Sequence, residues 1–130
     1  MKKTILLFSI HFIFIFNSMA QLSSIEELLK KITWHAQASI NIKTDSLNIY
    51  MDPYNVDTDS ADIIFITHSH HDHLSIEDIL KIANNDTWFI CPEDCVKTIK
   101  EKGFQNIQVS KPGDHKTVLG LAYNAVPAYN

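Results

Sequence analysis

Arginine is missing from this sequence altogether. All 11 basic residues are lysines, they stand against 15 acidic residues, and the formal net charge of the 130-residue chain is −4. Recognition of nucleic-acid phosphates depends on arginine and on a basic face, so the composition argues against a nucleic-acid partner. The absence of arginine also removes the usual bidentate clamp for an anionic substrate. A small neutral or ester-like molecule is therefore favoured as the substrate.

Cysteine is scarce. Cys91 and Cys95 are the only two, and they stand four residues apart. Cys91 ends an expected strand and Cys95 lies in the next expected helix, so their side chains need not face each other. Two half-buried thiols and a short disulfide both stay open as interpretations, and export of the protein would permit the disulfide. A role as metal ligands ranks third, because the chain offers better ligands elsewhere.

The sequence also lacks an apolar run long enough for a typical membrane-spanning helix. Residues 5–16 are almost entirely apolar, but such a helix needs roughly 20 apolar residues. Two lysines precede this run, and small residues at positions 18–20 follow it, which is typical of a signal peptide cut before Gln21. We therefore expect residues 1–20 to be a signal peptide, residues 21–130 to form one domain, and the protein to be secreted or periplasmic, with no membrane span after cleavage. An uncleaved N-terminal anchor is the alternative.

Histidine, in contrast, is concentrated in one short segment. Four histidines and one aspartate occupy six consecutive positions, His68-Ser69-His70-His71-Asp72-His73. Imidazole nitrogen and carboxylate oxygen are ligands that zinc prefers. The segment follows an apolar, β-branched run at 61–67, which is typical of a strand covered on both faces, and it precedes a helix start at Ser75. The sequence therefore predicts a metal site at the C-terminal end of a buried strand.

The spacing within this segment suggests how the ligands divide. His68 and His70 are two residues apart, so in extended backbone they point to the same side and could bind one cation together. Asp72 and His73 are adjacent, and the turn into the helix could aim both at a neighbouring position. One loop would thus supply half the ligands of a two-metal site, in which the metals lie about 3.5–4 Å apart. His71 is expected to face solvent or a partner group.

Periodicity and turn residues around this segment predict an α/β fold that is β-rich first and then β-α-β-α-β. The expected strands are residues 32–34, 39–43, 47–51, 61–67, 87–91 and 106–109, followed by two strand segments within 117–126 that break near Gly120. The expected helices are a short lead from Gln21 to Lys31, a helix capped by Ser75 with a buried stripe of Ile76, Ile79, Leu80 and Ala83, and a helix with Pro92 at its first position that runs to about Lys102.

The pattern His68-x-His70-x-Asp72-His73 resembles the HxHxDH signature of the metallo-β-lactamase-fold superfamily. Two further segments, Ile32-Thr33-Trp34 and Ile49-Tyr50-Met51-Asp52-Pro53, resemble the opening β-hairpin of its lactonase-like branch of uncharacterised zinc-dependent hydrolases. Val126-Pro127-Ala128-Tyr129-Asn130 resembles the strand that leads to the next metal ligand in that branch. The resemblance runs from about Ile32 to Asn130 and implies the N-terminal half of an αββα sandwich.

The resemblance also implies a chemistry. One or two zinc ions, or another divalent metal, would activate a water that attacks an ester, lactone or amide-type bond of a small molecule. His68 and His70 would hold the first metal, and Asp72 and His73 the second. Asp72 would in addition be the catalytic group that orients or deprotonates the water. Asp52 is a candidate to fix a ligand imidazole, and a plain Asp-Pro turn at the strand end is an equal alternative for it.

The chain departs from the family pattern in two places. The branch usually carries a Gly-His pair after the tryptophan, but Ala36-Gln37 stands there, and His35 just before it is not expected to be a ligand. A turn histidine, His115, matches no missing ligand either. The family's remaining ligands would fall beyond Asn130, so we expect the N-terminal half of the domain, truncated at its C-terminus. A truncated zinc-binding protein without catalysis and an inactive remnant are the alternatives.

Overall fold

The structure is a computed structural model that describes residues 25–127 of the chain. The chain divides into two compact units, residues 1–32 and 33–130. In the first unit, residues 25–29 are helical, which agrees with the expected helical lead. The start of that lead at residues 21–24 and the predicted signal peptide at residues 1–20 lie outside the described residues. Within the described part of the chain, no helix has the length and apolar character needed to cross a bilayer.

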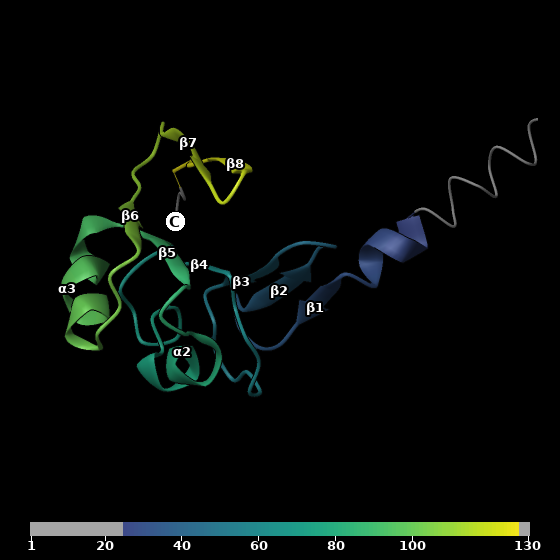
Figure 1. The fold of residues 1–130 in the computed structure, drawn as a ribbon, viewed down its shortest axis with the longest axis horizontal. Coiled ribbons are helices and arrows are strands. Elements are labelled where there is room, and N and C mark those ends of the chain that lie inside the picture. Colours follow the sequence, from purple (N-terminus) through teal and green to yellow (C-terminus); the bar gives the residue numbers. More distant parts are fainter. Residues whose placement is uncertain (1–24, 128–130) are drawn as a thin grey trace, which may run out of the picture. The chain divides into compact units, whose positions relative to one another are not determined.

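A six-stranded sheet is the centre of the fold (Figure 1). In their order across the sheet, the strands are β1 (Ile32–Trp34), β2 (Ile40–Lys43), β3 (Asn48–Met51), β4 (Ile63–Phe65), β5 (Trp88–Cys91) and β6 (Ile107–Val109). β2 pairs with β3 antiparallel, and β3 to β6 pair parallel to one another. The predicted order, β-rich first and then β-α-β-α-β, is confirmed, although several strands are shorter than expected.

Helices make two of the connections between the parallel strands, and residues 52–62, which join β3 to β4, contain no helix. α2 (Ile76–Ile82) joins β4 to β5, and α3 (Glu93–Glu101) joins β5 to β6. Ser75 is the N-cap of α2, and its side chain accepts from the backbone N–H of Asp78, as the sequence predicts. Pro92 is the N-cap of α3 and not its first helical residue, so that prediction is wrong by one position.

β4 is buried on both faces, as its apolar run predicts. Ile63 and Ile64 are both 0% exposed, and they belong to two different apolar clusters. The cluster of Ile64 includes Ile79 of α2 and Ile99 of α3, so the two helices cover one face of the sheet. Full burial of such a side chain contributes about 1.5–3 kcal/mol. The strand that leads into the histidine segment is therefore among the best-fixed parts of the fold.

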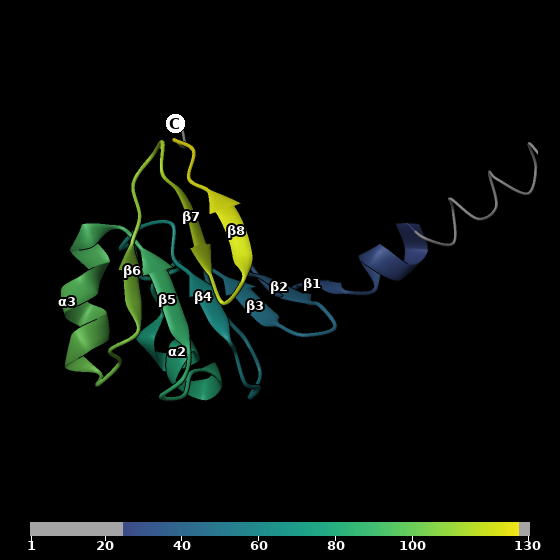
Figure 2. The ribbon, with the colours of Figure 1, turned by 45° about the horizontal axis from the view of Figure 1, so that its top comes forward.

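A hairpin covers part of the other face of the sheet (Figure 2). Its strands are β7 (His115–Val118) and β8 (Leu121–Asn124), and Val118 packs with Ile63 and Ile90 in the second cluster. The two turn residues have φ of 45° and 81°, as a two-residue hairpin turn with positive φ at both positions requires. The break near Gly120 is confirmed, but the strand begins at His115, which we had expected in a turn.

Three other predictions need correction or limits. Leu80 is 56% exposed, and Ile82, at 1%, takes its place on the buried side of α2 together with Ile79; a seven-residue helix needs only this i, i+3 pair to face the sheet. Cys91 and Cys95 are free thiols and are fully buried. At the C-terminus, residues 126–127 are not in a strand, and residues 128–130 lie outside the described residues.

Candidate metal centre

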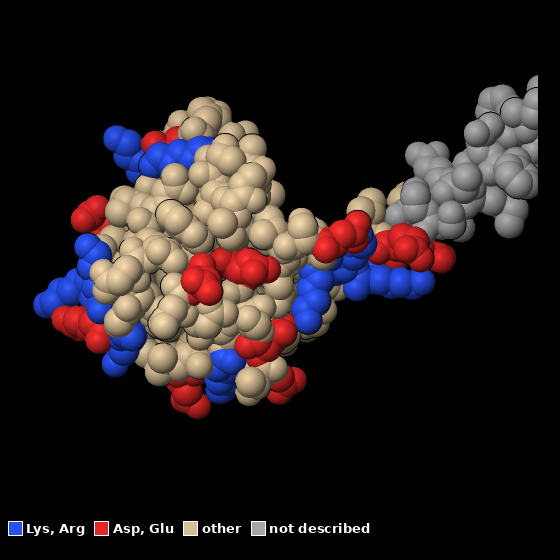
Figure 3. Space-filling view, in the orientation of Figure 1, with Lys and Arg blue, Asp and Glu red and all other residues tan. Residues whose placement is uncertain are grey.

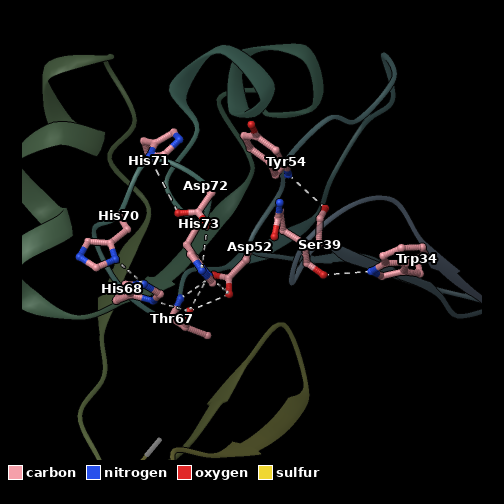
Figure 4. A network of polar contacts seen from close by, with 11 residues as sticks. Trp34, Ser39, Asp52, Tyr54, Thr67, His68, His70, His71, Asp72 and His73 are labelled. Carbon is pink, nitrogen blue, oxygen red and sulfur yellow. Dashed lines mark hydrogen bonds and ion pairs between the residues drawn. The ribbon is translucent and has the colours of Figure 1, made fainter. Parts of the chain in front are cut away.

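The loop between β4 and α2 carries the whole histidine segment. It leaves β4 at Phe65 and enters α2 after Ser75, so it stands at the C-terminal end of a parallel strand, where α/β sheets bind their ligands. Figure 4 shows the four predicted ligands on this loop, His68, His70, Asp72 and His73. The local fold therefore places them where the sequence predicts the site.

His68 and His70 face each other across the loop. The Nε2 atom of His68 lies 3.1 Å from Nδ1 of His70, and the ring centroids are 4.6 Å apart. The ring of His73 lies against the ring of His68, with the two centroids 3.9 Å apart. The expectation that His68 and His70 point to the same side is confirmed, and the third imidazole joins them.

Asp72 and His71 occupy the outer part of the loop. Oδ2 of Asp72 lies 3.7 Å from Nε2 of His73. The His71 side chain is 89% exposed and approaches Oδ1 of Asp72 at 3.9 Å, with an edge contact to the ring of Tyr54. His71 thus faces solvent, as predicted, while Asp72 and His73 form a second pair of donor atoms.

Asp52 is a buried carboxylate that accepts hydrogen bonds from the loop. It follows β3, is 1% exposed, and has a φ of 46°, a left-handed conformation that few residues other than glycine adopt. Its Oδ1 accepts the backbone N–H of Thr67 at 2.7 Å, and its Oδ2 accepts the Thr67 hydroxyl at 2.7 Å and lies 2.8 Å from Nδ1 of His73. Asp52 therefore ends its strand and also fixes the imidazole of His73.

The contacts of Asp52 and Thr67 indicate which ring nitrogen of His68 and of His73 carries the proton. A carboxylate only accepts hydrogen bonds, so Nδ1 of His73 donates to Asp52. Thr67 gives its one hydroxyl proton to Asp52 and therefore accepts from Nδ1 of His68, which lies 3.0 Å away. Each ring thus donates through Nδ1, so in the corresponding tautomer the lone pair lies on Nε2, which faces Nδ1 of His70 in His68 and Oδ2 of Asp72 in His73. A buried carboxylate thus orients two of the four predicted ligands.

The donor atoms fit a divalent cation in pairs. Two ligands of a tetrahedral zinc ion, each about 2.0–2.1 Å from the metal, lie about 3.4 Å from each other. The His68–His70 distance of 3.1 Å and the Asp72–His73 distance of 3.7 Å lie on either side of that value. Within residues 25–127, however, no three side chains of His, Cys, Asp or Glu are grouped so that they could hold a metal ion.

A second buried carboxylate fixes the exit of the loop. Asp78 is 6% exposed and accepts the Ser75 hydroxyl at 2.7 Å and the backbone N–H groups of Asn55 and Val56 at 3.0 and 3.2 Å. Burial alone would raise the pKa of Asp78, but the hydrogen bond from Lys81 and these donors hold it below its ordinary value. The start of α2 is thereby tied to the segment that follows Asp52.

Two other histidines that were not expected to be ligands, His35 and His115, lie outside this loop in the chain. His35 follows β1 and stacks on Tyr50, with ring centroids 5.9 Å apart. His115 bonds Asn124 on the hairpin. Sequence reasoning did not single out Thr67 or the pair Ser69 and Asp94, whose side chains are 2.7 Å apart. The available signal in the sequence was that Thr67 directly precedes His68 and Ser69 directly precedes His70.

A comparison with known protein families agrees with this fold. Residues 31–130 match the model of the beta-lactamase superfamily domain. The chain belongs to the beta-lactamase superfamily. The predicted resemblance to the metallo-β-lactamase-fold superfamily, based on the HxHxDH pattern, is therefore confirmed, and so is the predicted α/β fold class.

Known members of the family match along most of this chain. It is 31% identical over 100 residues, 69% of its length, to a UPF0173 metal-dependent hydrolase of Bacillus pumilus, and covers 43% of that protein. A solved structure described as a metal-dependent hydrolase of Parabacteroides distasonis is 34% identical, with a TM-score of 0.66 over 75% of this chain and 45% of that one. The metallo hydrolase Igni18 of Ignicoccus hospitalis, at 19% identity and a TM-score of 0.59, shares the fold. The chain thus spans less than half the length of these relatives.

Proposed function

We propose that this protein is a metal-dependent hydrolase with zinc as its metal. The observation that carries the proposal is the support of His68 and His73 by Asp52, directly or through Thr67, because these contacts use Nδ1 of each ring and leave the Nε2 atoms facing the other predicted ligands, His70 and Asp72. A ligand histidine whose other ring nitrogen is held by a carboxylate is the common arrangement in metal sites. The names of the relatives, metal-dependent hydrolases, support the same reading.

In this proposal the ligands divide as the donor pairs do. His68 and His70 would hold one ion, and Asp72 and His73 would hold a second. A bound divalent metal lowers the pKa of water and polarises the bond to be cleaved. Asp72 is partly exposed and lies next to His73. Its carboxylate would there orient the attacking water or accept its proton. Asp52 and Thr67 hold the imidazoles in place.

We propose a small molecule with an ester, lactone or amide-type bond as the substrate. The chain has no arginine and a net charge of −4, which disfavours nucleic acid. On the face seen in Figure 3, lysines are interspersed with acidic residues and form no continuous basic surface. Neither observation selects a bond type, so a hydrolysis assay needs several substrate classes.

We also propose that the protein works outside the cytoplasm. Residues 1–20 carry two lysines, an apolar run and small residues in the order of a signal peptide. Export would place residues 21–130 in the periplasm or the medium.

A second candidate is a metal-binding protein that does not turn over substrate. One observation favours it: in the described part of the chain, the side chains that could bind a metal ion form pairs, and no group of three is present. This candidate predicts metal binding without hydrolysis, whereas the first predicts both.

The test is hydrolysis by the full-length protein at saturating zinc, measured with p-nitrophenyl acetate, a γ-lactone and a p-nitroanilide. We expect His70→Ala and Asp72→Ala to reduce turnover to the level of a blank while the circular dichroism spectrum is unchanged. His71→Ala is the matched control, because it removes a histidine of the same loop that is 89% exposed, and it should keep the wild-type rate. Unchanged rates in both ligand variants would remove the hydrolase proposal.

A further inference from the structure

Ser69 links the metal loop to a helix far along the chain. It stands between His68 and His70, and its hydroxyl donates to Oδ2 of Asp94 at 2.7 Å across a separation of 25 residues. Asp94 lies in the first turn of α3. Nothing in the proposed ligand set uses either side chain, although the contact is as short as those that Thr67 makes with Asp52.

α3 gives Asp94 a fixed position. The helix is anchored in the core by Cys95 and Ile99, which are 0% and 1% exposed. The second oxygen of Asp94, Oδ1, lies 3.8 Å from Sγ of Cys95, so both carboxylate oxygens have neighbours. An acidic residue in the first turn is also favoured by the helix dipole. The acceptor for Ser69 therefore belongs to a rigid element.

Three hydroxyl–carboxylate contacts, each 2.7 Å long, hold the loop: Thr67 with Asp52, Ser69 with Asp94, and Ser75 with Asp78. The first fixes the entry of the loop and the third its exit. Only the contact of Ser69 with Asp94 involves a residue that stands between two predicted ligands in the chain. Ser69 and His70 are both exposed, so little packing holds this segment, and the hydrogen bond carries more of its positioning.

We propose that Asp94 is a positioning residue of the metal centre. Through the Ser69 hydroxyl it holds His68 and His70 with their facing nitrogens 3.1 Å apart. The two imidazoles are then already in position in the metal-free protein when one cation binds both. The inference rests on the proposed function, because it takes these two histidines as ligands. Removal of supporting groups of this kind costs about 10–100-fold in metal affinity.

The negative charge of Asp94 is a competing explanation, since a nearby carboxylate attracts a cation without positioning anything. Asp94→Asn separates the two, because asparagine keeps an oxygen that accepts from Ser69 but loses the charge. Ser69→Thr is the corresponding conservative change, because it keeps the hydroxyl. Positioning predicts that both variants stay close to the wild type.

The experiment is a Co²⁺ titration of the metal-free, full-length protein, followed by the visible absorption of the bound ion. We expect Asp94→Ala and Ser69→Ala each to weaken Co²⁺ binding by about 10–100-fold. The double variant should be no weaker than either single one, because both remove the same contact. Glu93→Ala is the matched control: it removes the neighbouring acid from the first turn of α3 and should leave the affinity within about twofold.

Three results would overturn the inference. They are wild-type affinity in Asp94→Ala, additive losses in the double variant, and a loss in Asp94→Asn as large as in Asp94→Ala. If the wild type itself binds no Co²⁺, the proposed function fails, and ¹⁵N relaxation of the metal-free protein decides the inference separately. Order parameters of residues 68–70 that fall in Asp94→Ala from about 0.85 to below about 0.6 support positioning, and unchanged values contradict it.

Discussion

The Nδ1 atom of His73 lies 2.8 Å from Oδ2 of Asp52, a side chain 1% exposed that stands 21 residues earlier in the chain. The same oxygen accepts the hydroxyl of Thr67, which in turn contacts Nδ1 of His68. One buried carboxylate therefore sets the orientation of two imidazoles. Its φ of 46° is an uncommon backbone conformation of the kind that concentrates at functional sites.

Asp52→Asn tests this support. Asparagine tolerates the left-handed conformation, so the backbone should be retained. Its amide has one acceptor oxygen in place of two, so it cannot accept all the hydrogen bonds that Thr67 and His73 give to Asp52. We expect zinc affinity to fall by about 10–100-fold, measured by competition with a chromophoric chelator. Asp57→Asn makes the same charge change at an exposed position and should bind like the wild type. Equal affinity in Asp52→Asn would mean that Asp52 only ends its strand.

The local pattern of the sequence predicted the elements that depend on local rules. The apolar run at β4, the Ser75 cap of α2 and the break at Gly120 are each determined by a few neighbouring residues, and the structure has all three. The HxHxDH segment was recognisable for the same reason, since its four predicted ligands lie on one loop.

Contacts between distant segments were not predictable in this way. The bond from Ser69 to Asp94 spans 25 residues, and no spacing rule connects a serine in one loop with an acid in the next helix. The exposure of Leu80 has a similar cause, because helical periodicity gives two possible apolar faces and the sheet selects the one with Ile82. For Asp52, only the fold showed that it ends its strand and also contacts the imidazole of His73.

The two cysteines should be unreactive in the folded protein. Burial, together with the nearby Asp94, raises the pKa of the Cys91 thiol to about 11 and that of Cys95 to about 12. At pH 8 neither is then a thiolate, and we expect a disulfide-exchange reagent to label neither within minutes. In guanidinium without reductant both should react. A denatured, unreduced protein without free thiols would show instead that the disulfide forms.

Asp78 should make folding stability depend on pH. Its pKa is lowered in the folded state from the ordinary value of 3.8, so its stabilisation is present above about pH 4 and is lost as the pH falls below that value. Asp78→Asn should lower the free energy of unfolding by about 1–3 kcal/mol at pH 7 and flatten its decline between pH 5 and pH 3. Denaturant titrations across this range measure both effects.

The exposed Asp86→Asn is the matched control for that experiment, and it should follow the wild-type profile. A wild-type slope in Asp78→Asn would contradict the role given to Asp78.

Export predicts a defined N-terminus. Intact mass measurement of the protein recovered from the periplasm or the medium of an expressing bacterium should show a chain that begins at Gln21. Ala20→Leu should slow the cut, because a small residue is needed directly before it. A recovered chain that still carries residues 1–20 would contradict the signal peptide and favour the uncleaved anchor.

The metal content of the full-length protein tests the central claim most directly. After reconstitution with zinc and removal of free metal, we expect the wild type to retain about one to two ions per chain, measured by mass spectrometry of the dissolved metal. His70→Ala should retain clearly less, and His71→Ala should retain as much as the wild type. A wild type that retains no zinc, or equal losses in both variants, would contradict a metal centre built on His68, His70, Asp72 and His73.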